Sequence, residues 1–198
     1  MPNVSIIIPT YDRVKYLKQT IQSFVALSYP QNKYEILVCD NNSSDETAQA
    51  VLEFTKRYPG LVKYLFEPRQ GVHFARNTAA KLARGDILYF TDDDIIADPN
   101  LLTSLVPVFS ADPQIASATG LVLPKWEEPP PDWILKHCQN GWLSLFPEFE
   151  DNVVIKSKHS DTPSCHQAIR KAVFFKTKGF HPENTAGTWI GDGETGLN

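Results

Sequence analysis

The feature that most constrains the fold of this chain is the alternation of two hydrophobic patterns between residues 4 and 109. Short, nearly unbroken apolar runs alternate with segments in which apolar residues recur every three or four positions. The first pattern is typical of strands covered on both faces, and the second of helices with one buried face. Strands that alternate with helices are joined by right-handed crossovers, so the sequence predicts an α/β domain with a mainly parallel central sheet flanked by helices.

The boundaries of these elements follow from the runs and from capping signals. The expected strands cover residues 4–9, 35–39, 62–66 and 86–91, and the expected helices present apolar residues inward within 14–25, 48–55, 74–82 and 102–106. Ser43 and Glu46 have the spacing of a capping box before the second helix. Asp98, followed by Pro99, has the pattern of an N-cap before the fourth.

The second half of the chain is less regular. Residues 115–123 are expected to form another strand, and the stretch from Pro124 to about Ser164 is rich in Pro, Trp and His without clear periodicity. A strand at 164–169 and a short helix at 171–178, ending at Gly179, are expected to follow. With no internal repeat, the sequence indicates one domain with an elaborated second half.

Charge and composition exclude several functions. The net charge is -4 and the pI near 5.7, which argues against nucleic acid as a partner because phosphate binding needs concentrated Lys and Arg. No run approaches the roughly 18 to 20 apolar residues of a membrane span, and the N-terminus lacks the pattern of a signal peptide. Three cysteines without CxxC spacing favour reduced thiols. We therefore expect a cytoplasmic protein.

Carboxylates stand where three of the first four strands end. Asp12 follows the first strand, Asp40 ends the second, and Asp92-Asp93-Asp94 follows the fourth. Ligands of such sheets bind beyond the carboxyl ends of the strands, where helix N-termini and loop amides converge. The sequence therefore places the candidate site at this edge.

The run Asp92-Asp93-Asp94 is the most informative of these. Asp92 and Asp94 are two positions apart, so a chain leaving a strand can direct both to the same side. Adjacent carboxylates repel, and a divalent cation relieves this repulsion; Mg²⁺ and Mn²⁺ typically bind one or two carboxylates together with substrate phosphate oxygens. An isolated run of this kind is more often a solvated turn. Its position directly after a buried strand favours a metal site.

Two common nucleotide motifs do not fit. A dinucleotide-binding Rossmann fold needs glycines in its first strand–helix turn, whereas here the turn is Thr10-Tyr11-Asp12-Arg13. A literal GxGxxG occurs at residues 191–196, but outside any strand–turn–helix unit, and there is no Walker A loop.

Several segments resemble one known family in order. VSIIIPTYDR, LVCDNNSSDET and GVHFARNTAAKLARGDILYFTDDD are similar to the N-terminal half of the family 2 nucleotide-sugar glycosyltransferases, which have the GT-A fold. SCHQAIRKAVFFKTKGFHPE resembles their acceptor-side strand and the loop before the catalytic base, and GDGETGLN the segment usually written E-D-x-E-L. The resemblance implies one GT-A catalytic domain over 1–198. Its nucleotide-binding half would be 1–110 and its acceptor-side half 111–198, C-terminally truncated at Asn198, where the family continues into a helix.

The resemblance also implies roles for individual residues. The nucleobase pocket would be lined by Pro9, Thr10, Tyr11 and Asp12, with Asp40 bonding the base. Arg76 would sit near the nucleotide. Asp92 and Asp93 would lie in the nucleotide site, with Asp92 facing the ribose or the donor sugar.

The remaining roles concern the metal and the base. Asp94 would ligate the Mn²⁺ or Mg²⁺ that bridges the diphosphate. Asp192 would be the general base, and Glu194 is the alternative, because Gly191 stands where the family has a Glu before the base.

The implied activity is metal-assisted, inverting transfer of a sugar from a nucleotide diphosphate donor to an acceptor hydroxyl. The expected donor is a UDP-sugar, and GDP and TDP stay open. Chemistry agrees: a metal can stabilise the leaving diphosphate, and the hydroxyl needs a carboxylate to take its proton. The expected acceptor is a carbohydrate or a lipid-linked sugar, as in polysaccharide biosynthesis, and the latter would allow peripheral membrane association. Two alternatives stay open: a sugar-phosphate nucleotidyltransferase, although residues 10–15 lack its glycine-rich loop, and a nucleotide-binding module without activity.

Overall fold

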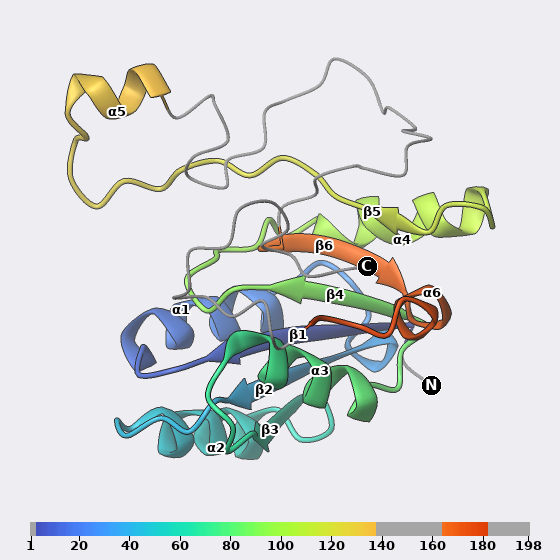
Figure 1. The fold of residues 1–198 in the computed structure, drawn as a ribbon, viewed down its shortest axis with the longest axis horizontal. Helices are drawn as coiled ribbons and strands as arrows, with labels where there is room; N and C mark the ends of the chain where they lie inside the picture. Colours follow the sequence, from blue (N-terminus) through green and yellow to red (C-terminus); the bar gives the residue numbers. More distant parts are fainter. Residues whose placement is uncertain (1–2, 138–163, 182–198) are drawn as a thin grey trace.

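The structure, a computed structural model, describes residues 3–137 and 164–181 (Figure 1). Its centre is a six-stranded sheet with the strand order β3-β2-β1-β4-β6-β5. The strands are β1 (Val4–Thr10), β2 (Tyr34–Asp40), β3 (Val62–Phe66), β4 (Ile87–Thr91), β5 (Ser117–Ala118) and β6 (His166–Arg170). The first four are parallel, whereas β6 is antiparallel to β4 and β5 is antiparallel to β6. The expected mainly parallel sheet is confirmed.

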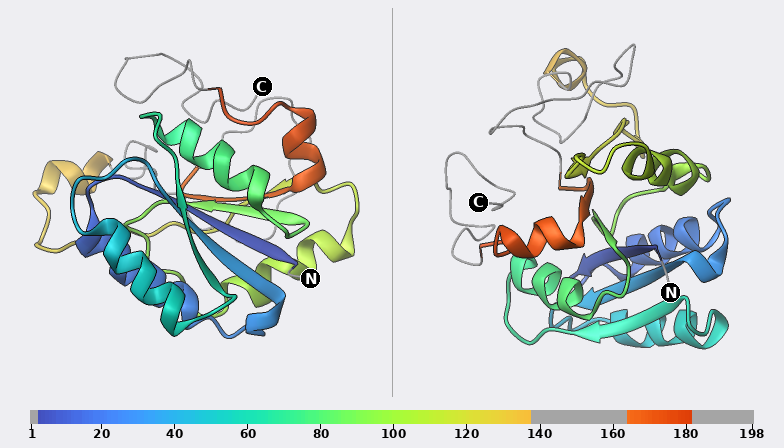
Figure 2. Two further views of the ribbon diagram at one scale, coloured as in Figure 1. Left: turned by 90° about the horizontal axis from the view of Figure 1, so that it is seen from below. Right: turned by 90° about the vertical axis from the view of Figure 1, so that its right-hand side faces the viewer.

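Helices cover both faces of the sheet (Figure 2). They are α1 (Val14–Val25), α2 (Thr47–Arg57), α3 (Val72–Leu82), α4 (Leu101–Ala111) and α6 (Lys171–Lys176). The chain also forms a 3₁₀ turn at Gln31–Lys33 and a short helix, α5 (Asp132–His137), which stands away from the sheet (Figure 1). Alternate residues of β1 divide between two apolar clusters. Ile6 packs with α1, α2 and α4 on one face, and Ile7 packs with α3 and α6 on the other. Burial on both faces explains why these strands are apolar throughout.

The strand register brings the carboxyl ends together. Thr10, the last residue of β1, pairs with Asp40, the last of β2, and Asp40 pairs with Phe66, the last of β3. The loops after these strands and after β4 therefore converge at one edge of the sheet. None of the helices in the described ranges has the length and apolar character that a bilayer crossing requires.

Both predicted helix caps are wrong. Helix α2 begins at Thr47 without a side-chain cap, and Ser43 Oγ instead accepts a hydrogen bond from the N–H of Asp12 at 3.1 Å. Helix α4 begins at Leu101, and Asp98 Oδ1 accepts from the N–H of Asn100 in the turn before it. In the first case a loop distant in sequence engages the hydroxyl, which spacing along the chain cannot reveal.

Three further details differ from expectation. Leu52 lies on the exposed side of α2, whose buried residues are Thr47, Ala50 and Val51. The strand expected at 115–123 is reduced to β5 at the sheet edge, and Leu121 and Leu123 are exposed. Helix α5 forms within the stretch that was expected to be irregular. An apolar run at an edge has only one neighbouring strand, so hydrophobicity alone overestimates its length.

Candidate functional site

A cavity of about 470 Å³ opens at the edge where β1 and β4 end. Five of its lining residues were expected at the site, namely Pro9, Thr10, Tyr11, Asp92 and Asp93. Five others were not, namely Arg13, Asn41, Gln70, Gly71 and Val72. The walls therefore come from the end of β1, from the loops after β1, β2, β3 and β4, and from the start of α3.

The other predicted site residues are placed differently. Asp12, Asp40, Arg76 and Asp94 are not among the residues that line the cavity. Asp192 and Glu194 lie outside the described residues, so their assignment as base stays a prediction.

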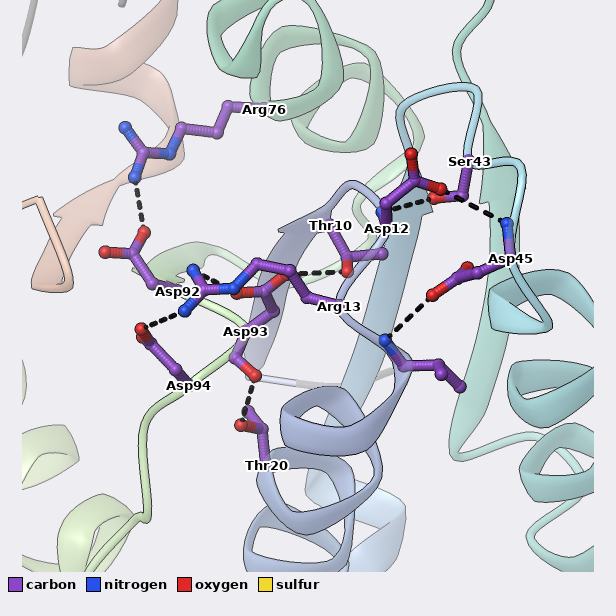
Figure 3. A network of polar contacts seen from close by, with 11 residues as sticks. Thr10, Asp12, Arg13, Thr20, Ser43, Asp45, Arg76, Asp92, Asp93 and Asp94 are labelled. Carbon is purple, nitrogen blue, oxygen red and sulfur yellow. Dashed lines mark hydrogen bonds and ion pairs between the residues drawn. The ribbon is translucent and has the colours of Figure 1, made fainter. Parts of the chain in front are cut away.

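The three aspartates after β4 have three different environments (Figure 3). Asp93 is buried, with its side chain 6% exposed, and accepts a 2.7 Å hydrogen bond from Thr10 Oγ1. Its carbonyl accepts a hydrogen bond from Thr20 Oγ1 on α1. Burial raises the pKa of Asp93, although the hydroxyl of Thr10 and the guanidinium of Arg13 oppose the shift. Asp93 therefore ties β4 to β1 and α1 while it lines the cavity.

Asp92 is held from the other side of the sheet. Arg76 on α3 is 4% exposed, and its Nη2 donates to Asp92 Oδ1 at 2.8 Å. The guanidinium also lies over the ring of Phe180, at 5.2 Å from the ring centroid. A buried cation needs an anionic partner, so this pair fixes the direction of Asp92. Arg76, expected near the nucleotide, reaches the cavity through Asp92.

Arg13 bridges the remaining two carboxylates. Its Nη1 lies 3.1 Å from Asp93 Oδ1 and its Nη2 lies 2.8 Å from Asp94 Oδ2. Burial lowers the pKa of Arg13, but the nearby carboxylates, Asp93 first, outweigh it, and the net shift is upward. The guanidinium is therefore a permanent positive charge on the wall of the cavity.

Asp12 supports the loop wall and does not face the cavity. It has a positive φ of 50°, and its Oδ1 accepts hydrogen bonds from the backbone N–H groups of Ser44 and Asp45. These bonds, the one from Ser44 first, lower the pKa of Asp12. Asp12 thus ties the loop after β1 to the loop after β2.

Asp40 is turned into the protein. It is 2% exposed, its Oδ2 accepts from the hydroxyl of Tyr64 at 2.9 Å, and its Oδ1 accepts from the N–H of Ser43 at 2.8 Å. Burial, together with the hydrogen bond to Asp40 and the charge of Asp40, raises the pKa of Tyr64 to about 12. The residue at this strand end that lines the cavity is Asn41.

Asn41 holds the opposite wall in place. Its Nδ2 donates to the carbonyls of Glu67 and Arg69 at 3.1 and 2.6 Å, and its Oδ1 accepts from the N–H of Gly71 at 2.8 Å. Gly71 has a φ of 134°, a conformation that side chains disfavour, and directly precedes α3. Glu67 is a second anchor of this wall, because its carboxylate accepts hydrogen bonds from Arg69 and Thr78. These bonds, those from Arg69 first, lower the pKa of Glu67 to about 2.

Replacing Asn41 with alanine is expected to loosen this wall. The substitution removes three hydrogen bonds to the 67–71 loop and leaves buried and partly buried backbone groups without these partners, which costs about 1–3 kcal/mol. Amide hydrogen exchange at Gly71 should accelerate by roughly tenfold or more. The control is Asn32→Ala, an exposed asparagine in the 3₁₀ turn. Unchanged exchange at Gly71 in Asn41→Ala would contradict the role of Asn41.

The unexpected lining residues carried weak signals in the sequence. Arg13 and Asn41 stand beside the predicted carboxylates Asp12 and Asp40, and Gly71 precedes a helix, as phosphate-binding loops often do. No single pattern indicates which neighbour faces inward. Which of two neighbouring side chains lines the cavity depends on hydrogen-bond partners about 30 residues away along the chain.

Comparison with known proteins gives a consistent result. The sequence model of Glycosyl transferase family 2 matches residues 5–176. Glycosyltransferase AglE of Haloferax volcanii is 36% identical over 94 residues, which is 48% of this chain and 31% of that protein. Chondroitin synthase of Escherichia coli is 30% identical over 116 residues, 59% of this chain and 16% of that protein. The chain spans about a third or less of these two relatives.

Solved structures resemble the fold over most of the chain. The mannosyltransferase PcManGT from Pyrobaculum calidifontis, in complex with GDP-Man and Mn²⁺, has a TM-score of 0.68 at 23% identity and covers 92% of this chain and 48% of its own. TarS 1-349 of S. aureus has a TM-score of 0.70 at 21% identity and covers 94% of this chain and 52% of its own. The fold is the GT-A fold of these enzymes. With the match to residues 5–176, these findings identify the chain as a member of glycosyl transferase family 2.

Proposed function

We propose that the chain transfers a sugar from a nucleotide diphosphate donor to an acceptor hydroxyl with inversion and with help from a divalent cation. The observation that carries the proposal is the cavity at the ends of β1 and β4, with Tyr11 on one wall and the Asp92-Asp93-Asp94 run beside it, in a family 2 chain. Family membership favours glycosyl transfer over nucleotidyl transfer. TarS structures with UDP and UDP-GlcNAc support UDP as the nucleotide, although PcManGT carries GDP-Man.

Tyr11 is the candidate platform for the nucleobase. Tyr11 lines the cavity and is 49% exposed. Aromatic rings interact well with flat partners through offset stacking. Pro9 and Thr10 extend the same wall, and Asn41 with the 67–71 loop closes the other side. This arrangement supports a base held between the loops after β1 and β3.

The residues beside the cavity suit a divalent cation. Asp94 carries a 39% exposed carboxylate and already attracts a cation, the guanidinium of Arg13. The described ranges contain no cluster of three or more His, Cys, Asp or Glu side chains arranged for a metal, but Mg²⁺ and Mn²⁺ typically need one or two carboxylates plus phosphate oxygens. Asp94 would hold the ion, which would supply positive charge against the departing diphosphate.

The protein's own groups then have separate tasks. Asp92, fixed by Arg76, would accept hydrogen bonds from the ribose or donor sugar. Asp93 would keep the loop in place through Thr10 and Thr20. Asp192, or Glu194 in its place, would take the proton of the acceptor hydroxyl from the face opposite the leaving group, which gives inversion.

A thermal-shift series tests the proposal directly. UDP at about 100 times its Kd should stabilise the chain by about 2.7 kcal/mol, which raises Tm by about 5–10 °C for a protein of this size. The shift should be larger with Mn²⁺ than with EDTA, and larger for UDP than for GDP or TDP. If none of the three nucleotides shifts Tm, nucleotide binding is contradicted. If GDP gives a larger Tm shift than UDP, the donor nucleotide is GDP and not UDP.

Release of UDP from UDP-sugars separates an enzyme from an inactive binding module. The expected result is donor turnover that needs Mn²⁺ or Mg²⁺ and rises with a carbohydrate acceptor. Nucleotide binding without turnover, with every sugar and acceptor tried, would favour the binding module.

A further inference from the structure

Arg13 occupies a special place among the charges of the site. It lies between the end of β1 and the start of α1, and its side chain reaches back over the acidic run after β4 (Figure 3). One guanidinium contacts two carboxylates, Asp93 at 3.1 Å and Asp94 at 2.8 Å. The same side chain lines the cavity. Arg13 therefore offsets part of the negative charge of Asp93 and Asp94 from the side that faces the proposed nucleotide.

The two ion pairs are not equivalent. Asp93 is buried and is also held by the hydroxyl of Thr10. Asp94 is 39% exposed, and within residues 3–137 and 164–181 its carboxylate forms its one hydrogen bond and ion pair with Arg13. Asp93 is therefore fixed by the fold, whereas Asp94 is free to change partner.

A divalent cation at Asp94 would meet this guanidinium. Both need the oxygens of the same carboxylate, and even on separate oxygens two positive groups a few ångströms apart repel each other. Cation binding must therefore weaken or replace the pair between Arg13 and Asp94. Without Arg13, the carboxylates of Asp93 and Asp94 would repel each other and attract a cation more strongly.

We propose that Arg13 is an internal counter-ion that stands in for the divalent cation at Asp94 and competes with it. The inference rests on the proposed function only in placing that cation at Asp94. In the free protein Arg13 compensates one of the two negative charges of Asp93 and Asp94 and keeps cation affinity low. A diphosphate adds negative charge and phosphate ligands, so the cation binds tightly only together with the nucleotide. Arg13 thereby couples metal binding to donor binding.

Titration with Mn²⁺ alone, in the absence of nucleotide, tests the competition. Free Mn²⁺ is measured by its electron paramagnetic resonance signal in wild type, Arg13→Gln and Arg13→Lys. Arg13→Gln should bind Mn²⁺ at least about fivefold more tightly than wild type, equal to roughly 1 kcal/mol. Arg13→Lys retains the charge and should stay near wild type. Equal affinities in wild type and Arg13→Gln would overturn the proposal.

Two controls assign the effect. Arg57→Gln removes the same charge at the exposed C-terminal end of α2, and its Mn²⁺ affinity should equal that of wild type. The double variant Arg13→Gln/Asp94→Asn should lose the gain. A gain that persists without Asp94, or that also appears in Arg57→Gln, would show that the ion binds elsewhere or responds to net charge, and would overturn the proposal.

Stability gives a second readout that needs neither nucleotide nor turnover. In EDTA, Arg13→Gln should melt below wild type because Asp93 and Asp94 lose their shared counter-ion, and Mn²⁺ should restore more of Tm than in wild type. If Arg13→Gln does not fold in EDTA, added Mn²⁺ should restore folding of this variant but not of the double variant. If Mn²⁺ has no effect on the folding of Arg13→Gln, competition between Arg13 and the cation at Asp94 is contradicted. Failure of the proposed function would appear separately, as wild type that UDP does not stabilise.

Discussion

Asp94→Ala is expected to remove the part of nucleotide binding that depends on a divalent cation. In wild type, Mn²⁺ should increase the Tm shift caused by UDP; in the variant, the shifts with Mn²⁺ and with EDTA should be equal. Cation stabilisation of a leaving group is worth several kcal/mol, so kcat/KM should fall by about 10²- to 10³-fold. The fold should be little affected, because the Asp94 carboxylate is half-exposed and Asp93 still pairs with Arg13.

The matched control for this prediction is Asp86→Ala. Asp86 is exposed and directly precedes β4, at the opposite end of the strand from Asp94, so the change in net charge is the same. It should keep both the Mn²⁺ increment and the kcat/KM of wild type. An increment that survives in Asp94→Ala would show that the cation is held by other residues.

The second large effect concerns stability at the opposite edge of the sheet. Glu35 on β2 is fully buried, and its Oε1 accepts from Ser5 Oγ at 2.7 Å and from the N–H of Arg84 at 2.6 Å. Its Oε2 accepts from Lys63 Nζ at 2.8 Å and from Arg84 Nε at 2.9 Å. Burial opposes the charged form, but these hydrogen bonds outweigh it and lower the pKa of Glu35. One carboxylate thus joins β1, β2, β3 and the segment before β4.

Glu35→Ala should lower the free energy of unfolding by about 3 kcal/mol. Loss of one member of a buried ion pair typically costs about 3–5 kcal/mol, and the lower end applies because Lys63 and Arg84 can turn to water. Urea denaturation measures the difference. The control Glu53→Ala, on the exposed side of α2, should stay within about 0.5 kcal/mol of wild type. A similar loss in both variants would mean that the network around Glu35 adds nothing.

The same network predicts a pH dependence. The pKa of Glu35 is lowered in the folded protein, so its stabilising contribution is complete above the unfolded pKa, near 4.5, and is lost as the pH falls through the folded value. The stability difference between wild type and Glu35→Gln should therefore be constant at neutral pH and shrink below about pH 4.5. If the stability difference between wild type and Glu35→Gln does not change with pH, even where Glu35 is fully protonated, the charged form of Glu35 is not its source.

The sequence alone was sufficient for the architecture and for the edge of the sheet that carries the site. Apolar runs that alternate with helical periodicity can bury their side chains only as strands covered on both faces, so the parallel direction of β1 to β4 followed from local pattern, although their order in the sheet did not. Parallel strands end at one edge, and this brought Tyr11 and the run after β4 together without knowledge of any contact. The strand expected at 164–169 was also located, as β6, but its antiparallel direction was not predicted.

Tertiary structure decided what each polar side chain contacts. Asp40 faces Tyr64, whereas its neighbour Asn41 lines the cavity. Asp92 pairs with Arg76, and Asp93 and Asp94 both pair with Arg13. Sequence spacing assigns side chains to faces of strands, but loops follow no fixed alternation. The partners lie between 16 and 83 residues apart along the chain, and their meeting depends on how the loops after β1, β2 and β4 pack together. A carboxylate's place at a strand end is therefore readable from sequence, whereas its partner is fixed only when the sheet is assembled.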